Sequence, residues 1–240
     1  MGERADSFGP LAAQYERTRP GYPKEAVAVA LSNGARAVVD IGAGTGKLTA
    51  VLVSLGLEVV AVEPDEQMAA VLAVRLPGVE LRPGRAEALP LEDASCDALF
   101  FGQSWHWADS AQAGREAARV LRAGGSLALL WNISDDEVGW VRRLRQLTGS
   151  EATVGDFRPP PPPAGFCEGH RHHSDSSRFL SRSLLIELVS TWSTVSTLPA
   201  ARRAEVLAAV EELVSSEPAL SASEEIRLPQ LCVTCYYHRL

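Results

Sequence analysis

The chain of 240 residues is short of basic side chains, has no long apolar run and contains only four cysteines. Its 23 lysines and arginines are outnumbered by 30 acidic residues, which gives a formal net charge of −7. The basic residues form no stripe, which argues against a nucleic-acid substrate. No apolar run approaches the roughly 20 residues that a membrane span needs. Residues 1–6 also lack the basic-then-apolar pattern of a signal peptide, so we expect a cytoplasmic protein with no membrane partner.

The few cysteines and histidines do not predict a metal site. Cys232 and Cys235 have the C-x-x-C spacing, but they fall in a predicted strand, where residues three apart point to opposite faces. They are better interpreted as core residues with the free thiols of a cytosolic protein. His170, His172 and His173 have no acidic or cysteine ligand at a convincing spacing. We therefore expect no metal.

Valine and glycine are concentrated in one stretch, residues 37–68. A Val-rich run at 37–41 is typical of a buried strand, and apolar residues at helical spacing follow across 48–55. A second apolar run, 59–62, ends on Glu63. This is one βαβ unit, whose right-handed crossover leads ligand-binding loops to the carboxyl ends of the strands. Three glycines alternate between the first strand and the helix: Gly42, Gly44 and Gly46.

The glycine spacing and the nearby acids narrow the choice of ligand. Glycines let a ligand approach the backbone, and an acid after the second strand can accept hydrogen bonds from ribose hydroxyls. A dinucleotide site needs G-x-G-x-x-G, but the third glycine comes one position early and Lys47 takes its place. Asp40, before the loop, would repel a pyrophosphate and suits a cation. S-adenosylmethionine (AdoMet) is a nucleoside with an ammonium and a sulfonium; a nicotinamide dinucleotide is the alternative.

Five blocks of the sequence resemble the class I AdoMet-dependent methyltransferases. Residues 40–46, DIGAGTG, resemble motif I of that family, and Glu63 with Pro64 resembles its ribose-binding acid. The resemblance covers nearly the whole chain, is strongest over residues 8–132, and is closest to the small-molecule branch (methyltransferase type 11) that includes trans-aconitate and quinone-biosynthesis enzymes. The other blocks follow in the family's order: GRAEALP at 84–90, QSWHW at 103–107 and LRAGG at 121–125.

The resemblance implies an α/β fold with a Rossmann-like, doubly wound sheet of seven strands. The sheet is expected to be mostly parallel with an antiparallel last strand, helices on both faces and a helical cover inserted before that strand. The implied regions are a lid and first helix at 1–36, an AdoMet-binding core at 37–148, a proline-rich crossover and substrate cover at 149–230, and the final strand at 231–240.

Local patterns predict helices outside the first βαβ unit. Ser110 is expected to cap a helix that runs to Arg122, and the fifth strand then covers 126–131. A further helix is predicted from Asp135 through Leu147. In the cover, apolar residues at helical spacing predict one helix over 184–192 and another after Pro199.

The resemblance also implies cofactor-binding residues. Tyr15 and Arg19 match a lid over the cofactor, where Arg19 would pair with its carboxylate; a surface arginine is the alternative. Arg85 is a departure, because many relatives carry an adenine-binding acid there and a guanidinium has no acceptor. The cofactor-binding candidates are Tyr15, Arg19, Asp40, Gly42, Ala43, Gly44, Glu63, Pro64, Ala86, Glu87 and Gln103, the last through its backbone carbonyl.

The block at 103–107 follows the fourth strand, at the edge where such folds keep their chemistry. His106 is a candidate general base, since an ordinary imidazole has a pKa near 6.5. Trp105 and Trp107 are candidate walls of a substrate pocket. The alternative is that His106 and Trp107 only pack beneath the lid.

These features together predict AdoMet-dependent methyl transfer to a small-molecule acceptor. The protein would mainly align the acceptor with a methyl group that is already activated. Two alternatives remain: an AdoMet-binding module without catalysis, suggested by Arg85, and an NAD-dependent oxidoreductase.

Overall fold

A computed structural model of the chain describes residues 12–150, 157–222 and 224–240. Residues 1–11 of the predicted lid region and 151–156 of the predicted crossover lie outside the described residues. The rest of both regions is described below.

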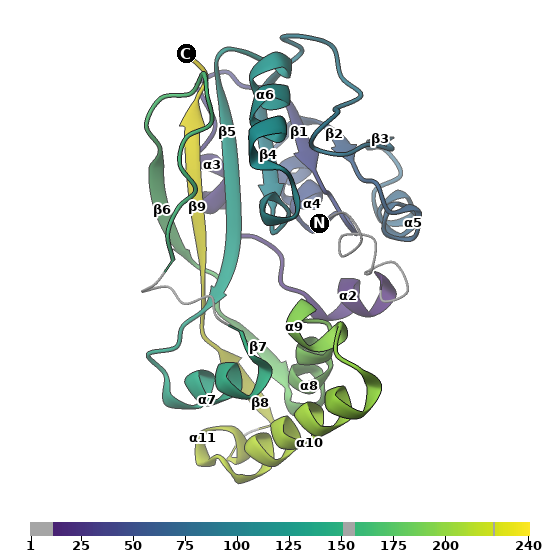
Figure 1. The fold of residues 1–240 in the computed structure, drawn as a ribbon, viewed down its shortest axis with the longest axis vertical. Helices are drawn as coiled ribbons and strands as arrows, with labels where there is room; N and C mark the ends of the chain where they lie inside the picture. Colours follow the sequence, from purple (N-terminus) through teal and green to yellow (C-terminus); the bar gives the residue numbers. More distant parts are fainter. Residues whose placement is uncertain (1–11, 151–156, 223) are drawn as a thin grey trace.

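The core is a seven-stranded sheet with the spatial order β3-β2-β1-β4-β5-β9-β6 (Figure 1). Neighbouring strands from β3 to β5 are parallel, whereas β9 is antiparallel to both β5 and β6. This topology confirms the predicted doubly wound fold with an antiparallel last strand. The strands are β1 (Ala37–Ile41), β2 (Glu58–Val62), β3 (Glu80–Arg82), β4 (Cys96–Gly102), β5 (Leu121–Ser134), β6 (His170–Asp175) and β9 (Gln230–His238).

Alternate residues of the strands point to opposite faces of the sheet, and each face packs against its own helices. In β4, Ala98 and Phe100 pack with residues of α3 and α4, whereas Leu99 and Phe101 pack with residues of α6. Figure 1 shows α6 in front of the sheet and α3 and α4 behind it. These two apolar layers explain why the strands are almost continuously apolar. The helices are α3 (Lys24–Ala28), α4 (Lys47–Ser54), α5 (Glu66–Arg75) and α6 (Ser110–Val120).

Two helix starts differ from the sequence prediction. The N-cap of α6 is Asp109, not Ser110, because the Asp109 carboxylate accepts from the Gln112 backbone N–H at 2.9 Å. The helix ends at Val120, and β5 begins directly afterwards, five residues earlier than predicted. The next helix, α7, spans Gly139–Thr148 rather than beginning at Asp135, since β5 continues through Ser134.

A second hydrophobic core lies in the cover, below the sheet in Figure 1. It is built by α7 to α11 and a small sheet of β7 and β8. The strand β6, within the predicted crossover, adds to the main sheet, whereas α7, within the predicted core, packs into the cover. The remaining elements are β7 (Arg178–Ser181), α8 (Arg182–Ser190), α9 (Ser193–Ser196), α10 (Ala200–Ser216), α11 (Pro218–Ser221) and β8 (Glu225–Leu228).

The short helix α2 (Ala12–Thr18) lies between the core and the cover (Figure 1). On the core side, Glu16 pairs with Lys47 of α4 and Arg75 of α5, both at 2.9 Å. On the cover side, the Gln14 amide donates to the Ser190 hydroxyl at 2.8 Å. The helix therefore joins the two halves by polar contacts at both of its sides.

The described ranges show neither a membrane-spanning helix nor a metal site. Within them, no helix combines the length and the apolar character that crossing a bilayer requires. The same ranges contain no group of three or more His, Cys, Asp or Glu side chains placed to hold a metal ion. The four cysteines are free, with Cys232 and Cys235 in the apolar layers on opposite faces of the sheet.

Candidate functional site

Two adjoining cavities lie where β1, β2 and β4 end. The first has a volume of about 620 Å³ and the second about 380 Å³. The first is lined mainly by the loops that follow these strands and by the loop after β3. The second is lined by the lid, the end of β5 and the cover. Five of the described residues line both cavities: Tyr15, Arg19, Gln103, His106 and Ser193.

The glycine loop after β1 brings backbone to the wall of the first cavity. Gly42 has a φ of +66°, and a Cβ there would stand 2.6 Å from the Cβ of Ser104. Ser104 is itself fixed, because its hydroxyl donates to the Ile41 carbonyl at 2.7 Å. Gly44 has a φ of +57°, but a Cβ there would meet nothing within 4 Å. The loop is thus packed tightly behind Gly42 and open in front of Gly44, where a ligand can reach the backbone.

Glu63, at the end of β2, is held in place by backbone donors. Its Oε2 accepts from the Gly44 N–H at 2.7 Å, and its Oε1 accepts from the Asp65 N–H at 2.9 Å. The residue is only 7% exposed and lines the first cavity. A carboxylate oriented by two backbone groups keeps lone pairs for further donors, which suits the two hydroxyls of a ribose.

Asp40 lies beneath the glycine loop and not in the cavity wall. It is 1% exposed, and its Oδ2 accepts from the Thr49 hydroxyl at 2.6 Å. Burial raises the pKa of this carboxyl to about 7, and the charge of Glu63 adds to the rise. Ala43 also packs inward, against Ala61 and Leu72. The strand alternation explains the position of Asp40, since Val39 and Ile41 face the opposite layer.

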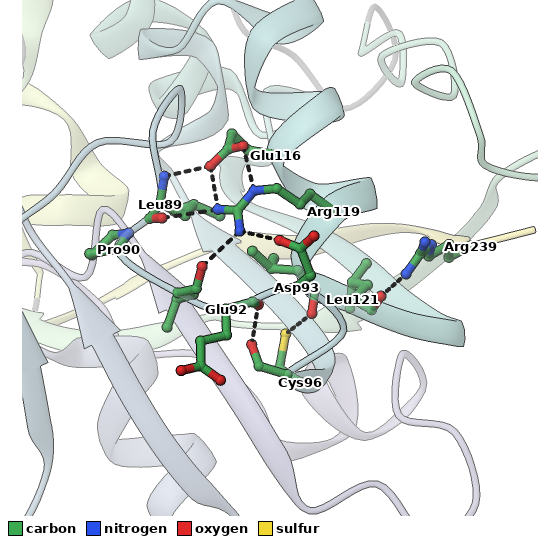
Figure 2. A network of polar contacts seen from close by, with 12 residues as sticks. Leu89, Pro90, Glu92, Asp93, Cys96, Glu116, Arg119, Leu121 and Arg239 are labelled. Carbon is green, nitrogen blue, oxygen red and sulfur yellow. Dashed lines mark hydrogen bonds and ion pairs between the residues drawn. The ribbon is translucent and has the colours of Figure 1, made fainter.

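The loop after β3 is anchored by an arginine network (Figure 2). Arg119 of α6 donates to the carboxylates of Glu116 and Asp93 and to the carbonyls of Leu89 and Leu91. Glu116 in turn accepts from the Leu89 N–H at 2.7 Å. The anchored loop presents its other end to the first cavity. The residues it places there are Gly84, Arg85, Ala86 and Glu87.

Gln103 follows β4 in an unusual backbone conformation. Its φ is +59°, in the left-handed region that a non-glycine residue rarely adopts. Two hydrogen bonds hold the residue in this conformation. Its backbone N–H donates to the Leu130 carbonyl at 2.9 Å, and its side-chain amide donates to the Asn132 carbonyl at 3.0 Å. Such strained residues concentrate at functional sites. The turn brings Gln103 to the boundary of the two cavities.

The 3-10 helix Trp105–Trp107 divides its aromatic residues between core and cavity. His106 is exposed and lines both cavities, and Trp107 lines the first. Partial removal of the imidazole from water by the surrounding protein lowers the pKa of His106, and the positive charge of Arg19 lowers it further. The ring is therefore neutral near pH 7. Trp105 does not wall a pocket: it is 5% exposed and packs edge-on against Phe101 in the core. One turn of 3-10 helix cannot present three adjacent rings to the same side.

Tyr15 and Arg19 of the lid region stand over both cavities. The Arg19 guanidinium lies over the Tyr15 ring, 5.0 Å from its centroid. It also donates to the hydroxyl and the carbonyl of Thr191 in the cover, at 3.1 and 2.8 Å. Arg19 is therefore not a free surface arginine, and it forms part of the wall between the cavities.

Much of the wall of the second cavity comes from residues that the sequence analysis did not select as candidates. Aromatic rings come from Tyr22, Trp131, Phe157 and Trp192, and Gln230 contributes at the start of β9. The rings of Trp131 and Phe157 are in contact, with centroids 5.1 Å apart. Ser193, which lines both cavities, was missed for the same reason, since cover residues carry no local pattern that marks a site.

The two cavities differ in charge. No aspartate or glutamate is among the described residues that line the second cavity, where the cations are Arg19 and Lys47. The first cavity contains both signs, with Arg19 and Arg85 beside three acids. The acids of the first cavity are Glu63, Glu87 and Asp109.

The first cavity gathers most of the residues that the sequence singled out. Asp40, Ala43 and Trp105 are the candidates that do not line either cavity. The candidates that line the first cavity are Tyr15, Arg19, Gly42, Gly44, Glu63, Pro64, Ala86, Glu87, Gln103, His106 and Trp107.

Comparisons with known proteins agree with this architecture. A family model described as a methyltransferase domain matches residues 39–129. An uncharacterized methyltransferase of Mycobacterium tuberculosis is 44% identical over 228 residues, which is 95% of this chain and 93% of that protein. The chain belongs to this methyltransferase family. A second relative, an uncharacterized methyltransferase of Schizosaccharomyces pombe, is 32% identical and matches 89% of each chain.

A solved structure shows how far the methyltransferase fold extends. A protein of Anaeromyxobacter dehalogenans, described as a type II methyltransferase, superposes with a TM-score of 0.66. The match covers 92% of this chain and 97% of that one, at 23% identity. This likeness concerns the fold alone, and it includes the cover as well as the sheet.

Proposed function

We propose that this methyltransferase uses AdoMet as methyl donor and a small molecule as acceptor, with the donor in the first cavity and the acceptor in the second. The observation that carries the proposal is Glu63, a buried carboxylate held by the Gly44 and Asp65 backbone at the cavity wall. It stands next to an open glycine backbone in a cavity of about 620 Å³, large enough for a nucleoside.

The residues of the first cavity fit AdoMet better than a dinucleotide. Three acids line it, and they suit a ligand with an ammonium and a sulfonium. The same acids would repel the two phosphates of a nicotinamide dinucleotide. Asp40, under the loop, adds to this preference, because a bound cation would favour its charged form and offset the cost of its burial.

Each residue has a role in this arrangement. Glu63 would hold the ribose, and the Gly42 and Gly44 backbone would face the methionine portion. The anchored loop would place Ala86 and Glu87 at the adenine. Gln103, whose φ of +59° turns the chain at the boundary, would offer its carbonyl to the ammonium. When bound, AdoMet supplies a methyl group on a charged sulfur; the acceptor's lone pair bonds to the methyl carbon while the S–C electron pair stays on sulfur.

His106 would take the proton from an acceptor that must lose one. It lines both cavities, so it lies where the two ligands would meet. Its lowered pKa keeps the imidazole neutral near pH 7, the form in which it can accept a proton. Arg19, held to the cover through Thr191, and Tyr15, whose ring lies against the Arg19 guanidinium, would close the meeting point from water.

A thermal-shift titration tests the proposal directly. AdoMet, S-adenosylhomocysteine and NADH are added separately, and a ligand at a hundred times its dissociation constant adds about 2.7 kcal/mol to the stability of the folded state. We expect a rise in melting temperature with the two adenosyl-sulfur ligands and none with NADH. A rise with NADH alone would overturn the proposal in favour of an oxidoreductase.

A methyl-transfer assay with the same protein distinguishes an enzyme from a module that only binds AdoMet. Arg85 lines the cavity at a position where an acid could have bound adenine, and this observation keeps a binding module as second candidate. Radiolabelled methyl transfer to a panel of small molecules is the measurement. Binding of S-adenosylhomocysteine without transfer to any acceptor would favour the module.

A further inference from the structure

We infer that the second cavity binds the acceptor, and that the acceptor is a planar aromatic molecule that carries a carboxylate. This inference rests on the proposed function and names the class of molecule that the methyl group reaches. It comes from three properties of the cavity: the sign of its charge, the absence of a counter-ion at two arginines, and the aromatic character of its walls.

The charge of the second cavity is positive. Of its described lining residues, Arg19 and Lys47 are cationic and none is acidic. Lys47 already pairs with Glu16 at 2.9 Å. Arg19 donates only to a neutral hydroxyl and a neutral carbonyl, both of Thr191, and among the described residues it has no carboxylate partner. The guanidinium is therefore not neutralised by a described carboxylate of the protein. It lines both cavities, so it can bind an anion in the second cavity, while the AdoMet carboxylate that the family resemblance assigns to it would approach from the first.

Arg178 of β7 reinforces this positive charge from within the cover. Its Nε and one terminal nitrogen are buried and have no hydrogen-bond partner among the described residues. Burial and the charge of Arg19 both lower the pKa of Arg178, so the two guanidinium groups are near enough to repel. The preceding residue, Ser177, is bonded to Gln230, which lines the cavity. Two neighbouring cations without a counter-ion are costly, and a bound carboxylate would offset that cost.

The walls of the cavity fit a flat apolar body. Tyr22, Trp131, Phe157 and Trp192 all line it, and Trp131 and Phe157 are already in ring-to-ring contact. Aromatic rings pack favourably against a further planar ring in stacked or edge-on geometry. The volume of about 380 Å³ suits a molecule of one or two fused rings. The carboxylate would lie toward Arg19 and the ring between the aromatic walls.

Calorimetry with a matched pair of probes tests the inference. The protein is saturated with S-adenosylhomocysteine and titrated with 2-naphthoate or with its neutral isostere 2-naphthamide. We expect 2-naphthoate to bind at least tenfold more tightly, because only the carboxylate carries a charge that the two arginines attract. Equal affinity of the two probes, or no binding of either, would overturn the inference.

Single substitutions show which residues cause the preference for the carboxylate probe. Arg19→Gln should bring the ratio of the two affinities close to one, and Arg178→Gln should reduce it severalfold by removing charge without a direct contact. Arg203→Gln, on the exposed face of α10, is the matched control and should leave the ratio unchanged. Trp192→Leu should weaken both probes equally. If Arg19→Gln shows the same ratio of 2-naphthoate to 2-naphthamide affinity as the wild type, the inference is overturned. If Arg19→Gln does not fold, an unchanged ratio in Arg178→Gln overturns it instead.

The design separates this inference from the proposed function. Binding of S-adenosylhomocysteine is measured first in every variant, and the probe titrations are repeated without it. Loss of S-adenosylhomocysteine binding in the wild type would overturn the proposed function, while a carboxylate preference in the free protein would still support the anionic site. Normal S-adenosylhomocysteine binding without a carboxylate preference would overturn only the inference.

Discussion

The two cavities meet at His106, yet they are built in different ways. The first is formed by backbone turns at the ends of consecutive strands, and its key carboxylate, Glu63, is fixed by two backbone N–H groups. The second is formed by side chains that come from the lid, the end of β5 and the cover. A site made by backbone is set by the fold, whereas a site made by side chains can change without disturbing the sheet. We expect the first to serve a ligand common to the family and the second to set the specificity of this chain.

A substitution at the boundary between the cavities should have the largest effect of those considered, and it should act on turnover. His106→Ala should lower turnover by about a hundred- to a thousandfold, the usual contribution of a positioned acid–base group. The affinity for S-adenosylhomocysteine should change little. Because the pKa of His106 is lowered, the wild-type rate should fall only at a pH below the value at which an ordinary imidazole is protonated, and the variant should lose this dependence. Steady-state kinetics with an acceptor found by the radiolabel screen provide the test, and full turnover in His106→Ala would exclude a general base there.

The backbone-held acid should show the next largest effect, confined to the first cavity. Glu63→Ala should weaken S-adenosylhomocysteine ten- to a hundredfold, since the ribose loses its acceptor and the Gly44 and Asp65 N–H groups lose theirs. Calorimetry measures this affinity, and 2-naphthoate binding by the free variant should be unchanged. Glu168→Gln, an exposed acid far along the chain, is the control. Unchanged affinity in Glu63→Ala would remove the ribose assignment.

The buried acid under the glycine loop should make the stability of the free protein depend on pH. The folded protein holds the proton of Asp40 up to about pH 7, whereas an unfolded carboxyl loses it near pH 3.8. The stability from this group is therefore complete below about pH 4 and is lost as the pH rises through 7. Asp40→Asn has no such carboxyl and should not lose this stability. Between pH 5 and 8, the free energy of unfolding of the wild type should therefore fall by about 2 kcal/mol more than that of the variant.

Urea unfolding at several pH values measures this difference. Asparagine keeps an oxygen that can accept from the Thr49 hydroxyl, so the variant should fold. Glu168→Gln again provides the control, with a pH dependence like that of the wild type. Parallel stability curves for Asp40→Asn and the wild type would mean that Asp40 is ionised in the folded protein throughout this range.

The smallest effect should come from the anchor of the loop after β3. Arg119→Gln removes charge-assisted bonds to Glu116 and Asp93 (Figure 2), and partial exposure limits the cost to about 1 kcal/mol of unfolding free energy. Loosening of the loop should weaken S-adenosylhomocysteine two- to fivefold and leave 2-naphthoate unaffected. Arg122→Gln loses a comparable ion pair, to Asp97, and should keep normal affinity. A weaker 2-naphthoate site in Arg119→Gln would mean that the two cavities are coupled.

The sheet could be predicted because its strands carry a strong local pattern. The apolar runs of β1, β2 and β4 and the glycine turn after β1 follow directly from the buried parallel geometry. β6 could not be found in this way, since its sequence HRHHSD is mostly exposed at the edge of the sheet and has no apolar alternation. β7 and β8 are four residues each and owe their structure to packing in the cover.

The candidate site also has one part that local sequence patterns predicted and another that they did not. Residues of the first cavity follow strand ends, so motif and topology together placed Glu63, Gly44 and Gln103 near one another. Asp40 faces α4 beneath the loop, a position that follows from the alternation of side chains along the strand. Trp105 was misplaced because the turn of a 3-10 helix is not visible in the sequence. The walls of the second cavity join residues as distant as Tyr22 and Trp192, which no local pattern connects.

The order of the strands has a consequence for the synthesis of the chain. β9 lies between β5 and β6, so β6 pairs with nothing in the sheet until residues 231–236 are available. All of the cover except α7 is translated between β6 and β9. A growing chain can therefore form most of its first cavity early, because Ser193 is the one described lining residue that comes from the cover. The far edge of its sheet closes only after the cover has left the ribosome. A truncation within β9 would leave two strands with unpaired edges, and we expect such a chain to aggregate rather than fold.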